Sequence, residues 1–568
     1  MRLFHCIFIM SLVPAAFAET IELQPCASVQ LLQPVQPAFT KSELKLLCGD
    51  RNTAAWKSIP PEQARYFLKI FLEERGYHHP VFSISDKTVH IKPGALTRVQ
   101  QLSETGSPVP LGLERLRKVK GEVMTPAFLD RIERWATRQL QNQGYPCPKL
   151  KVLADPSTGI IEVSVNAGEK KNFSVVQENG IPGIKAGFLR RYDAFRLGEP
   201  FEKDLLIITE NRVISENLLS GFHLSESCED EALVIRQEGF AGPPRLLRLG
   251  FGINTEGILV NRTSWRNARL GTRGSSAEMT LYASAREQRL ESVLNWYHLP
   301  HPSRRSVRPQ LQWTHQNERL FETMELRAQA AYATSWDGAH FSLVAFAGPA
   351  LSEVRTFRGP SVGNSHFLAL DGTGILKSHD FEYFASDPRS GFSLQYGMSL
   401  SDQSLLSSAS VQRYSVRGEY LLNAGAYEPP LWIVGFRAGF GTTVTEDQDF
   451  QHSAIPANYF QYLGGSANLR GFGRQELPFA GTRLSSAFFD FEARLSHVLP
   501  FALEPLVFFD LGALSASSWS LDAPVYRSPG VGLRWASPVG IVRTTLAYGS
   551  PADDSGQWQF YFSLGEEF

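Results

Sequence analysis

The second half of the sequence is dominated by short segments in which apolar and polar residues alternate. From about residue 245, segments of about ten such residues follow one another between turns rich in Gly, Pro, Asp and Ser. The clearest are 246–254, 259–267, 277–285, 291–298, 323–334, 408–421, 431–441 and 487–496. This pattern predicts a β-barrel, with a large β-sandwich as the alternative. At about 20 residues per strand and turn, residues 246–568 suit roughly sixteen strands, although fourteen or eighteen would also fit.

Residues 1–18 have the features of a secretory signal. Arg2 gives a charged start, an apolar run extends from Leu3 to Val13, and Ala16-Phe17-Ala18 forms a cleavage site. A membrane anchor is the alternative, but the run is short and Pro14 interrupts it. We therefore expect a soluble N-terminus after cleavage. Loss of Arg2 lowers the net charge from −1 to −2, which excludes a strongly basic nucleic-acid binder.

No apolar run after the signal reaches the roughly 18 residues that a transmembrane helix needs. A secreted chain without such a run is expected to be either soluble or a β-barrel. The hydrophobic content of 43% fits a barrel, because only every second residue of a barrel strand faces lipid.

Four cysteines lie beyond the signal, which itself contains Cys6. Cys26 and Cys48 fall in one small unit, and we predict that they form a disulfide in an oxidising compartment. Cys147 and Cys228 fall in different units and are expected to stay reduced and buried.

An internal repeat occupies the first two-fifths of the chain. Three segments with helical apolar spacing each end at a glycine followed by an aromatic residue: 61–75 before Gly76-Tyr77, 125–140 before Gly144-Tyr145, and 202–218 before Gly221-Phe222. Two short strands follow each helix, at 81–85 and 88–92, 150–153 and 160–166, and 222–225 and 232–237. In the third unit a strand at 173–176 and a short helix at 187–192 come first. We predict α+β domains at 19–96, 97–170 and 171–244 and a barrel at 245–568. Three unrelated α+β domains are the alternative.

A glycine-rich stretch within the predicted barrel carries the motif Leu469-Arg470-Gly471-Phe472. Because glycine permits positive φ and close backbone approach, we expect a long folded loop with Arg470 at its tip. Further on, Asp510 shares one face of a predicted strand with Phe508, while the opposite face is wholly apolar. A lone carboxylate in that position points toward something polar or toward a cation, and Arg470 is the partner that we predict. A solvated arginine in a surface turn is the alternative.

After Asp510 the chain continues with Gly530-Val531-Gly532-Leu533-Arg534-Trp535-Ala536-Ser537-Pro538-Val539-Gly540, then Arg543, and later Phe560 to Phe568. With the arginine motif, these segments resemble the C-terminal signature of the outer-membrane assembly superfamily, the barrels with periplasmic polypeptide-transport-associated (POTRA) domains. The likeness is close over about the last hundred residues and looser elsewhere. The chain is most similar to the TamA-type branch, the outer-membrane subunits of the translocation and assembly module.

The resemblance implies three POTRA domains in the periplasm followed by a sixteen-stranded antiparallel barrel in the outer membrane. It implies that Arg470 reaches back inside the barrel and meets acidic residues on neighbouring strands, here Asp510 and the inward-facing Glu492. It also implies a C-terminal barrel signal that includes Gly565 and Phe568. The expected partners are a TamB-like, inner-membrane-anchored protein that spans the periplasm, unfolded outer-membrane proteins and the lipid bilayer, with no nucleic acid.

The function that follows is insertion or translocation of proteins, such as autotransporter-like substrates, at a lateral seam where the first strand meets the last. Gly250 and Gly252 weaken pairing in the first strand, or merely allow barrel curvature. The alternatives are a two-partner-type secretion channel, which usually carries two POTRA domains and a plug helix, a passive pore, and a lipid-transport barrel. These residues do not separate lipid transport from protein insertion.

No catalytic residue or cofactor is predicted, and we expect a protein that is not an enzyme. The stretch Gly464–Asn468 departs from the G-x-S-x-G nucleophile elbow at its last position. The pair His78-His79 is expected to lie in a turn that ends a helix rather than to bind a metal.

Overall fold

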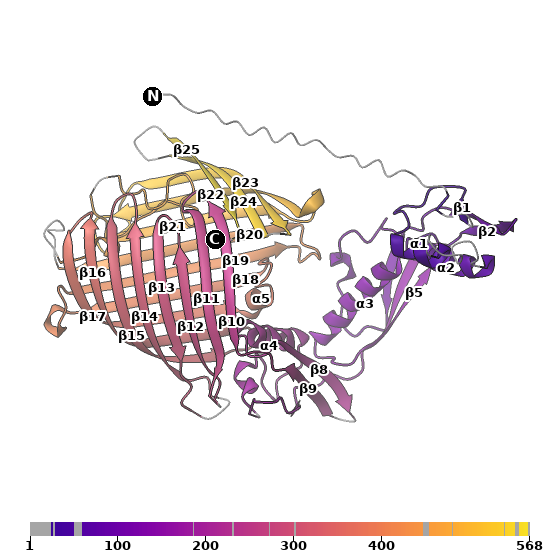
Figure 1. Ribbon diagram of the computed structural model, residues 1–568, viewed down its shortest axis with the longest axis horizontal. Helices are drawn as coiled ribbons and strands as arrows, with labels where there is room; N and C mark the ends of the chain where they lie inside the picture. The colour runs from indigo at the N-terminus through magenta and orange to yellow at the C-terminus, as the bar shows by residue number, and fades with distance from the viewer. Residues whose placement is uncertain are drawn as a thin grey trace. The chain divides into compact units, whose positions relative to one another are not determined.

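The computed structural model describes residues 24–565, except 26–28, 50–59, 186, 230–231, 272, 300–302, 447–453, 480, 539 and 551–555. The chain divides into two compact units, which we describe separately. The first unit contains two small α+β sheets, and the second contains a third α+β sheet and a closed barrel (Figure 1).

Each sheet of the first unit has a parallel and an antiparallel pair of strands. The order is β1-β3-β2 in the first sheet and β4-β6-β5 in the second, and β3 and β6 are the central strands. Leu68 and Leu72 of α2 share one apolar core with Ile91 of β3. The elements are β1 Val29–Leu31, α1 Lys41–Cys48, α2 Pro61–Glu73, β2 Val81–Ser85, β3 Thr88–Lys92, β4 Gln101–Thr105, η2 Leu113–Arg115, α3 Pro126–Gln141, β5 Lys149–Asp155 and β6 Ile160–Asn166.

The third sheet repeats this order as β7-β9-β8 and belongs to the second unit. Its elements are β7 Val175–Glu178, η3 Leu189–Tyr192, α4 Lys203–Ser215, β8 Gly221–Glu229 and β9 Ala232–Phe240. The three long helices begin and end within three residues of the predicted positions. Among the described residues, no helix is long and apolar enough to cross a membrane.

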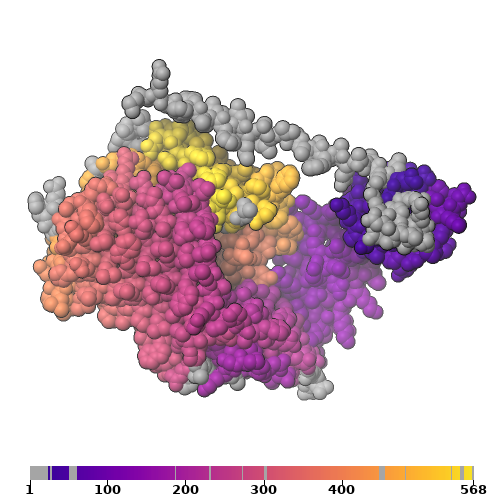
Figure 2. Space-filling view, viewed as in Figure 1, coloured from indigo at the N-terminus to yellow at the C-terminus, as the bar shows by residue number. Residues whose placement is uncertain are grey.

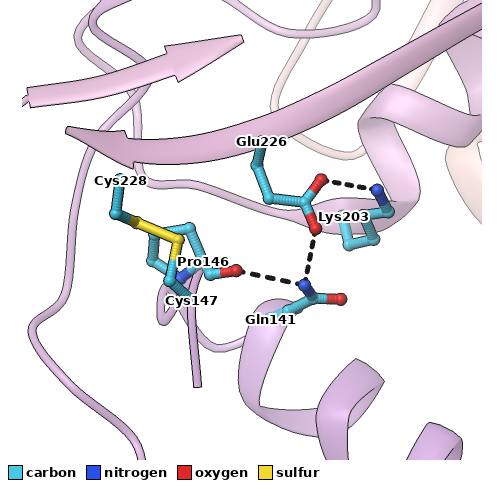
Figure 3. Close-up of a disulfide and its surroundings, with 6 residues drawn as sticks. All are labelled: Gln141, Pro146, Cys147, Lys203, Glu226 and Cys228. Atoms are coloured by element: carbon cyan, nitrogen blue, oxygen red, sulfur yellow. Dashed lines mark hydrogen bonds and ion pairs between the residues drawn. A yellow bond between two sulfur atoms is a disulfide. The ribbon is translucent and has the colours of Figure 1, made fainter. Parts of the chain in front are cut away.

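The expectation that Cys147 and Cys228 stay reduced and buried is wrong. They form a disulfide that ties the segment after α3 to β8 (Figure 3), and the Cys228 residue is exposed. Beside it, Glu226 accepts hydrogen bonds from Gln141 Nε2 at 2.7 Å and from Lys203 Nζ at 2.6 Å. The two cysteines are distant in sequence, so spacing could not reveal that they meet. Cys48 is also disulfide-bonded, and its predicted partner Cys26 lies outside the described residues.

The described strands from residue 245 onward close into a sixteen-stranded antiparallel barrel. Each strand pairs with its neighbours in sequence, and the last pairs with the first (Figure 1). The strands are β10 Arg245–Asn254, β11 Ile258–Leu270, β12 Ser275–Ala283, β13 Glu287–Asn295, β14 Ser306–Asn317, β15 Glu322–Asp337, β16 Phe341–Arg358, β17 Gly363–Ser378, β18 Gly391–Ser401, β19 Val411–Ala424, β20 Trp432–Thr445, β21 Ser485–Leu495, β22 Leu503–Ser515, β23 Val525–Ser537, β24 Gly540–Gly549 and β25 Gln557–Leu564. The short helix α5, His379–Tyr383, lies between β17 and β18.

The outer wall of the barrel is apolar, and Figure 2 shows part of it as a continuous surface. On β10, the large exposed apolar side chains are Leu247, Leu249, Phe251 and Ile253, which alternate with residues of the other face. Large exposed apolar residues also occur on β15, β22 and β25. Apolar residues outside and buried charges inside are typical of a barrel whose outer face meets lipid.

The third sheet is held to one rim of the barrel through charged side chains. Arg212 of α4 donates to Asp337 Oδ1 at 2.9 Å and to Glu382 Oε2 at 2.6 Å. Arg191 of η3 is 3% exposed, and its guanidinium carbon lies 3.5 Å from the Tyr297 ring centroid. Asp337 and Arg191 are both buried, so separating the third sheet from this rim would leave desolvated charges without their contacts.

Candidate functional site

The loop between β20 and β21 folds into the barrel and carries the arginine motif at its centre. Leu469 and Phe472 have no exposed surface and pack with Leu463, Leu477 and Leu514 in one apolar cluster. Gly464 has a φ of +111°, and a Cβ there would lie 2.2 Å from the carbonyl oxygen of Gly473. The glycine-rich composition therefore serves a tight turn that presents Arg470 to the barrel wall.

Arg470 lies at the centre of a buried ion network and is itself 1% exposed. Its backbone N–H donates to Asp510 Oδ2 at 2.8 Å, and its Nε and Nη2 donate to the same carboxylate at 3.0 and 2.6 Å. Nη1 donates to Glu492 Oε2 at 2.7 Å, and Nη2 also donates to Asp490 Oδ1 at 2.5 Å. The fork of the guanidinium thus serves three carboxylates at once, which a point charge could not do.

The aromatic ring of Phe508 packs against the guanidinium of Arg470. This ring is 4% exposed, and the guanidinium carbon of Arg470 lies 3.5 Å from its centroid. Phe508 and Asp510 lie on the same face of β22, since they are two residues apart. One strand therefore supplies both a carboxylate and an aromatic face to the same cation.

Two further arginines complete the network. Arg437 of β20 donates its Nε to Asp490 Oδ2 at 2.7 Å, and Arg543 of β24 donates to Glu492. Three cations thus face three carboxylates inside the barrel. Buried charges are tolerated when each is paired and hydrogen-bonded, so the network can hold the loop rigidly against β21 and β22.

The structure brings together the predicted set Arg470, Asp510 and Glu492. Sequence reasoning missed Asp490, although it lies two residues before Glu492 and so shares its strand face. It also missed Phe508 as a supporting ring, for which the same period of two was the available signal. Arg437 carried no signal beyond its place in the predicted strand 431–441. Arg543 belongs to the segments that resemble the superfamily, but no partner was predicted for it.

In the part of the chain that the structure describes, β10 and β25 are paired at two register positions. Among the described residues, these strands pair at Ile253–Leu564 and Asn254–Ser563, whereas β10 and β11 pair from Arg245–Asn267 through Asn254–Ile258. A Cβ on Gly252 would lie 2.8 Å from the carbonyl oxygen of Leu564. This glycine therefore allows the close approach of the last strand at the seam.

Of the remaining predicted residues, none that the structure describes belongs to the network. Gly565 is exposed, has a φ of +92° and follows β25, while Phe568 lies outside the described residues. His78 Nε2 lies 2.7 Å from the carbonyl oxygen of Met124, and His79 Nε2 lies 3.3 Å from that of Pro156. Within the described ranges, no group of three or more His, Cys, Asp or Glu residues could hold a metal ion.

When the chain is compared with known protein families, one domain family matches it. Residues 378–568 match the Omp85 superfamily domain, and this segment contains the loop, its acidic partners and β25. The chain is 30% identical over 121 residues to the outer membrane protein assembly factor BamA of Nitratidesulfovibrio vulgaris strain Hildenborough. That match spans 19% of this chain and 15% of the relative.

Several solved structures share similarity with larger parts of the chain. BamA from Haemophilus ducreyi lacking POTRA domains 1–3 matches with a TM-score of 0.49 and 13% identity, over 83% of this chain and 100% of that one. CdiB from Escherichia coli matches with a TM-score of 0.46 and 12% identity, over 89% and 98%. POTRA domains 3–5 of BamA from Haemophilus influenzae match with a TM-score of 0.26 and 13% identity, over 37% and 94%.

Proposed function

We propose that this protein, which carries an Omp85 superfamily domain over residues 378–568, inserts or translocates proteins at the outer membrane through the seam between β10 and β25. The observation that carries the proposal is that the described residues of β10 and β25 pair only at Ile253–Leu564 and Asn254–Ser563. A strand edge that is weakly paired can accept an incoming strand by β-augmentation, which requires no covalent chemistry.

The buried network explains how such a seam can open without loss of the barrel. Arg470 binds Asp510 of β22 and Glu492 of β21, so the wall on the C-terminal side of the seam is reinforced from inside. Strong pairing within that wall and weak pairing at its edge direct separation to the seam. The protein is on this proposal not an enzyme, and its site acts by holding strands in place.

We further propose the TamA-type role within the superfamily, with autotransporter-like substrates. The three α+β units would lie in the periplasm and receive substrate or a TamB-like, inner-membrane-anchored partner. The support is the repeated sheet order β1-β3-β2, β4-β6-β5 and β7-β9-β8, together with the sequence likeness of the C-terminal segments. Cross-linking from the first sheet in intact cells should capture a large periplasm-spanning protein, and its absence would contradict this role.

A seam lock tests the central claim. Cysteines at Ile253 and Leu564 would join β10 to β25, because these residues are register partners. A matched control joins Ile253 to Leu259, which is its partner on β11. We expect the oxidised seam lock to abolish assembly of outer-membrane substrates and the control to leave it intact.

Depletion of the protein in cells tests whether its substrates are proteins or lipids. Loss of a subset of β-barrel proteins from the outer-membrane proteome, with lipid composition unchanged, is expected. A changed lipid composition with an intact proteome would favour a lipid-transport barrel instead. Full activity of the seam-locked protein would contradict lateral opening and would favour passage through the lumen.

A further inference from the structure

The loop that carries Arg470 also touches the first hairpin of the barrel. Glu256 lies in the turn between β10 and β11, and its carboxylate accepts two hydrogen bonds from Ser466. The Ser466 backbone N–H lies 2.9 Å from Oε1, and the Ser466 hydroxyl lies 2.9 Å from Oε2. The N-terminal side of the seam is therefore attached to the loop by a charged acceptor.

The same loop is attached to the C-terminal side of the seam. Tyr561 of β25 is 5% exposed and donates its hydroxyl to the carbonyl oxygen of Phe472 at 2.5 Å. Gln557, also on β25, donates to the carbonyl oxygen of Gly471 at 3.3 Å. A few residues of the loop thus bind β25 and the turn that follows β10, one on each side of the seam.

We propose that the loop works as a clasp across the seam, and that Glu256 is the positioning residue at which the clasp releases. The clasp is defined by the Ser466–Glu256 contact on one side and the Phe472–Tyr561 contact on the other. This inference rests on the proposed function, because it states how the seam is kept shut between events of substrate transfer.

The two attachments differ in strength, and this difference determines which strand moves. On the other side the loop is fixed to the wall that ends in β25. Arg470 is held by carboxylates of β21 and β22, and Gly471 N–H donates to Ser528 of β23 at 3.0 Å. β25 itself is joined to this wall by pairing with β24 from Val542–Leu564 to Gly549–Gln557. On the β10 side, the loop holds a hairpin turn through two hydrogen bonds from Ser466 to Glu256, with Arg474 of the loop close enough to attract the same carboxylate. Breaking two hydrogen bonds costs less than dismantling a buried ion network. When the seam opens, the β10–β11 hairpin therefore moves away from the loop, while β25 stays with the loop.

The space between the loop and the seam supports a close-fitting clasp. A cavity of about 20 Å³ is lined from both sides, by Thr255 and Glu256 of the turn, Ser466 and Arg470 of the loop, and Tyr561 and Phe562 of β25. Such a volume holds about one water molecule. Separation of the turn from Ser466 would enlarge this space and admit water to the cross-seam hydrogen bond from Thr255 N–H to the carbonyl oxygen of Phe562.

Hydrogen exchange on the full protein in membranes tests the clasp. We expect Glu256→Ala to speed exchange of the Thr255 amide about tenfold and Ser466→Ala, which removes only the hydroxyl contact, about threefold. The matched control is Glu325→Ala, which breaks the contact of Asn458 of the same loop with β15, a strand that is not at the seam. That control should leave exchange of Thr255 unchanged.

Two further readouts separate release from a general loss of structure. The amides of Arg470 and Gly471 should stay protected in Glu256→Ala, because the loop remains with β25. Oxidising the cysteine pair at Ile253 and Leu564 should cancel the acceleration at Thr255. Unchanged exchange in both Glu256→Ala and Ser466→Ala, or equal loss of protection at Arg470, would overturn the proposal. These measurements need no substrate, so a fully active seam-locked protein would contradict the proposed function while the clasp could still stand.

Discussion

The guanidinium carbon of Arg470 lies 3.5 Å from the centroid of the Phe508 ring. A cation held over an aromatic face in a desolvated place gains up to about 2 kcal/mol. We therefore expect Phe508→Leu, which keeps an apolar side chain on β22, to weaken the docked loop by about 1–2 kcal/mol. The measure is hydrogen-exchange protection at Arg470, with the outward-facing Phe509→Leu as the control. Equal effects of the two substitutions would show that the ring acts through packing alone.

Replacing Arg470 should destabilise the docked loop more than replacing Phe508 does. Arg470→Ala leaves buried carboxylates without their shared cation, a loss on the order of 3–5 kcal/mol. Arg470→Lys should rescue poorly, since a point charge cannot reproduce the fork. In a double-mutant cycle with Asp510→Ala we expect a coupling of about 0.5–3 kcal/mol, measured by urea unfolding of the barrel. Strictly additive effects would contradict a direct interaction. The α+β units should stay folded in every variant.

Gly471 is expected to tolerate no side chain. A Cβ there would lie 2.4 Å from the Cα of Gly549 and 2.5 Å from the hydroxyl of Ser528. Gly471→Ala should therefore destabilise the docked loop by about 1–3 kcal/mol, as expected for overpacking. Gly473→Ala, in the same loop, is the matched control, because its Cβ would first meet the flexible Glu476 carboxylate at 3.2 Å. Equal tolerance of the two changes would contradict the close approach.

The third α+β sheet should respond to pH through Asp193. Burial raises the pKa of this carboxyl to about 6, despite the hydrogen bond from Arg190. Its folded-state pKa lies above the ordinary value of 3.8, so stability falls as pH rises from about 4 to about 6 and stays reduced above that range.

Replacing Asp193 with asparagine removes the carboxyl group that titrates. Asp193→Asn should stabilise the third sheet by about 1–3 kcal/mol at pH 7.5 and have little effect at pH 4. Protection factors of the β8 and β9 amides provide the measurement. Asp155→Asn on β5, outside the third sheet, should leave those factors unchanged. A gain for Asp193→Asn that is the same at both pH values would contradict the linkage.

The Cys147–Cys228 disulfide closes a long loop, with a sequence separation of 81 residues. The chain-entropy model assigns such a loop about 4–5 kcal/mol. Replacing both cysteines with serine should lower the thermal stability of the third sheet by a comparable amount. A double variant is more specific than a reducing agent, because Cys48 is also disulfide-bonded. Unchanged unfolding of the double variant would show that other contacts at this junction suffice.

Local patterns in the sequence were enough to predict the helices and strands and part of the ion network around Arg470. The period of two placed Asp510 on the strand face opposite the apolar residues, and the glycine-rich composition indicated a folded loop around Arg470. The resemblance to the superfamily added Glu492 and the inward direction of the loop. The same period could have identified Asp490. These inferences succeed because a strand fixes the face of each residue through its backbone geometry alone.

Contacts that depend on the path of the chain through space could not be predicted. The Glu256–Ser466 contact exists only because the loop crosses the lumen to the first hairpin. The spacing of residues in the sequence does not predict this path of the loop. The Cys147–Cys228 disulfide was missed for the same reason. Pairing depends on the distance between two Cα atoms in the fold, and four cysteines permit several connectivities.

The docked loop also bears on the order in which this barrel forms. Its partners are spread over Asp510 of β22, Ser528 of β23 and Tyr561 of β25. The docking site of the loop is incomplete until those strands stand side by side, and the charge of Arg470 is more stable in water until β21 and β22 have paired. Full docking of the loop is thus a late step in the biogenesis of the protein, and it makes completion of the C-terminal wall a precondition for closing the lumen.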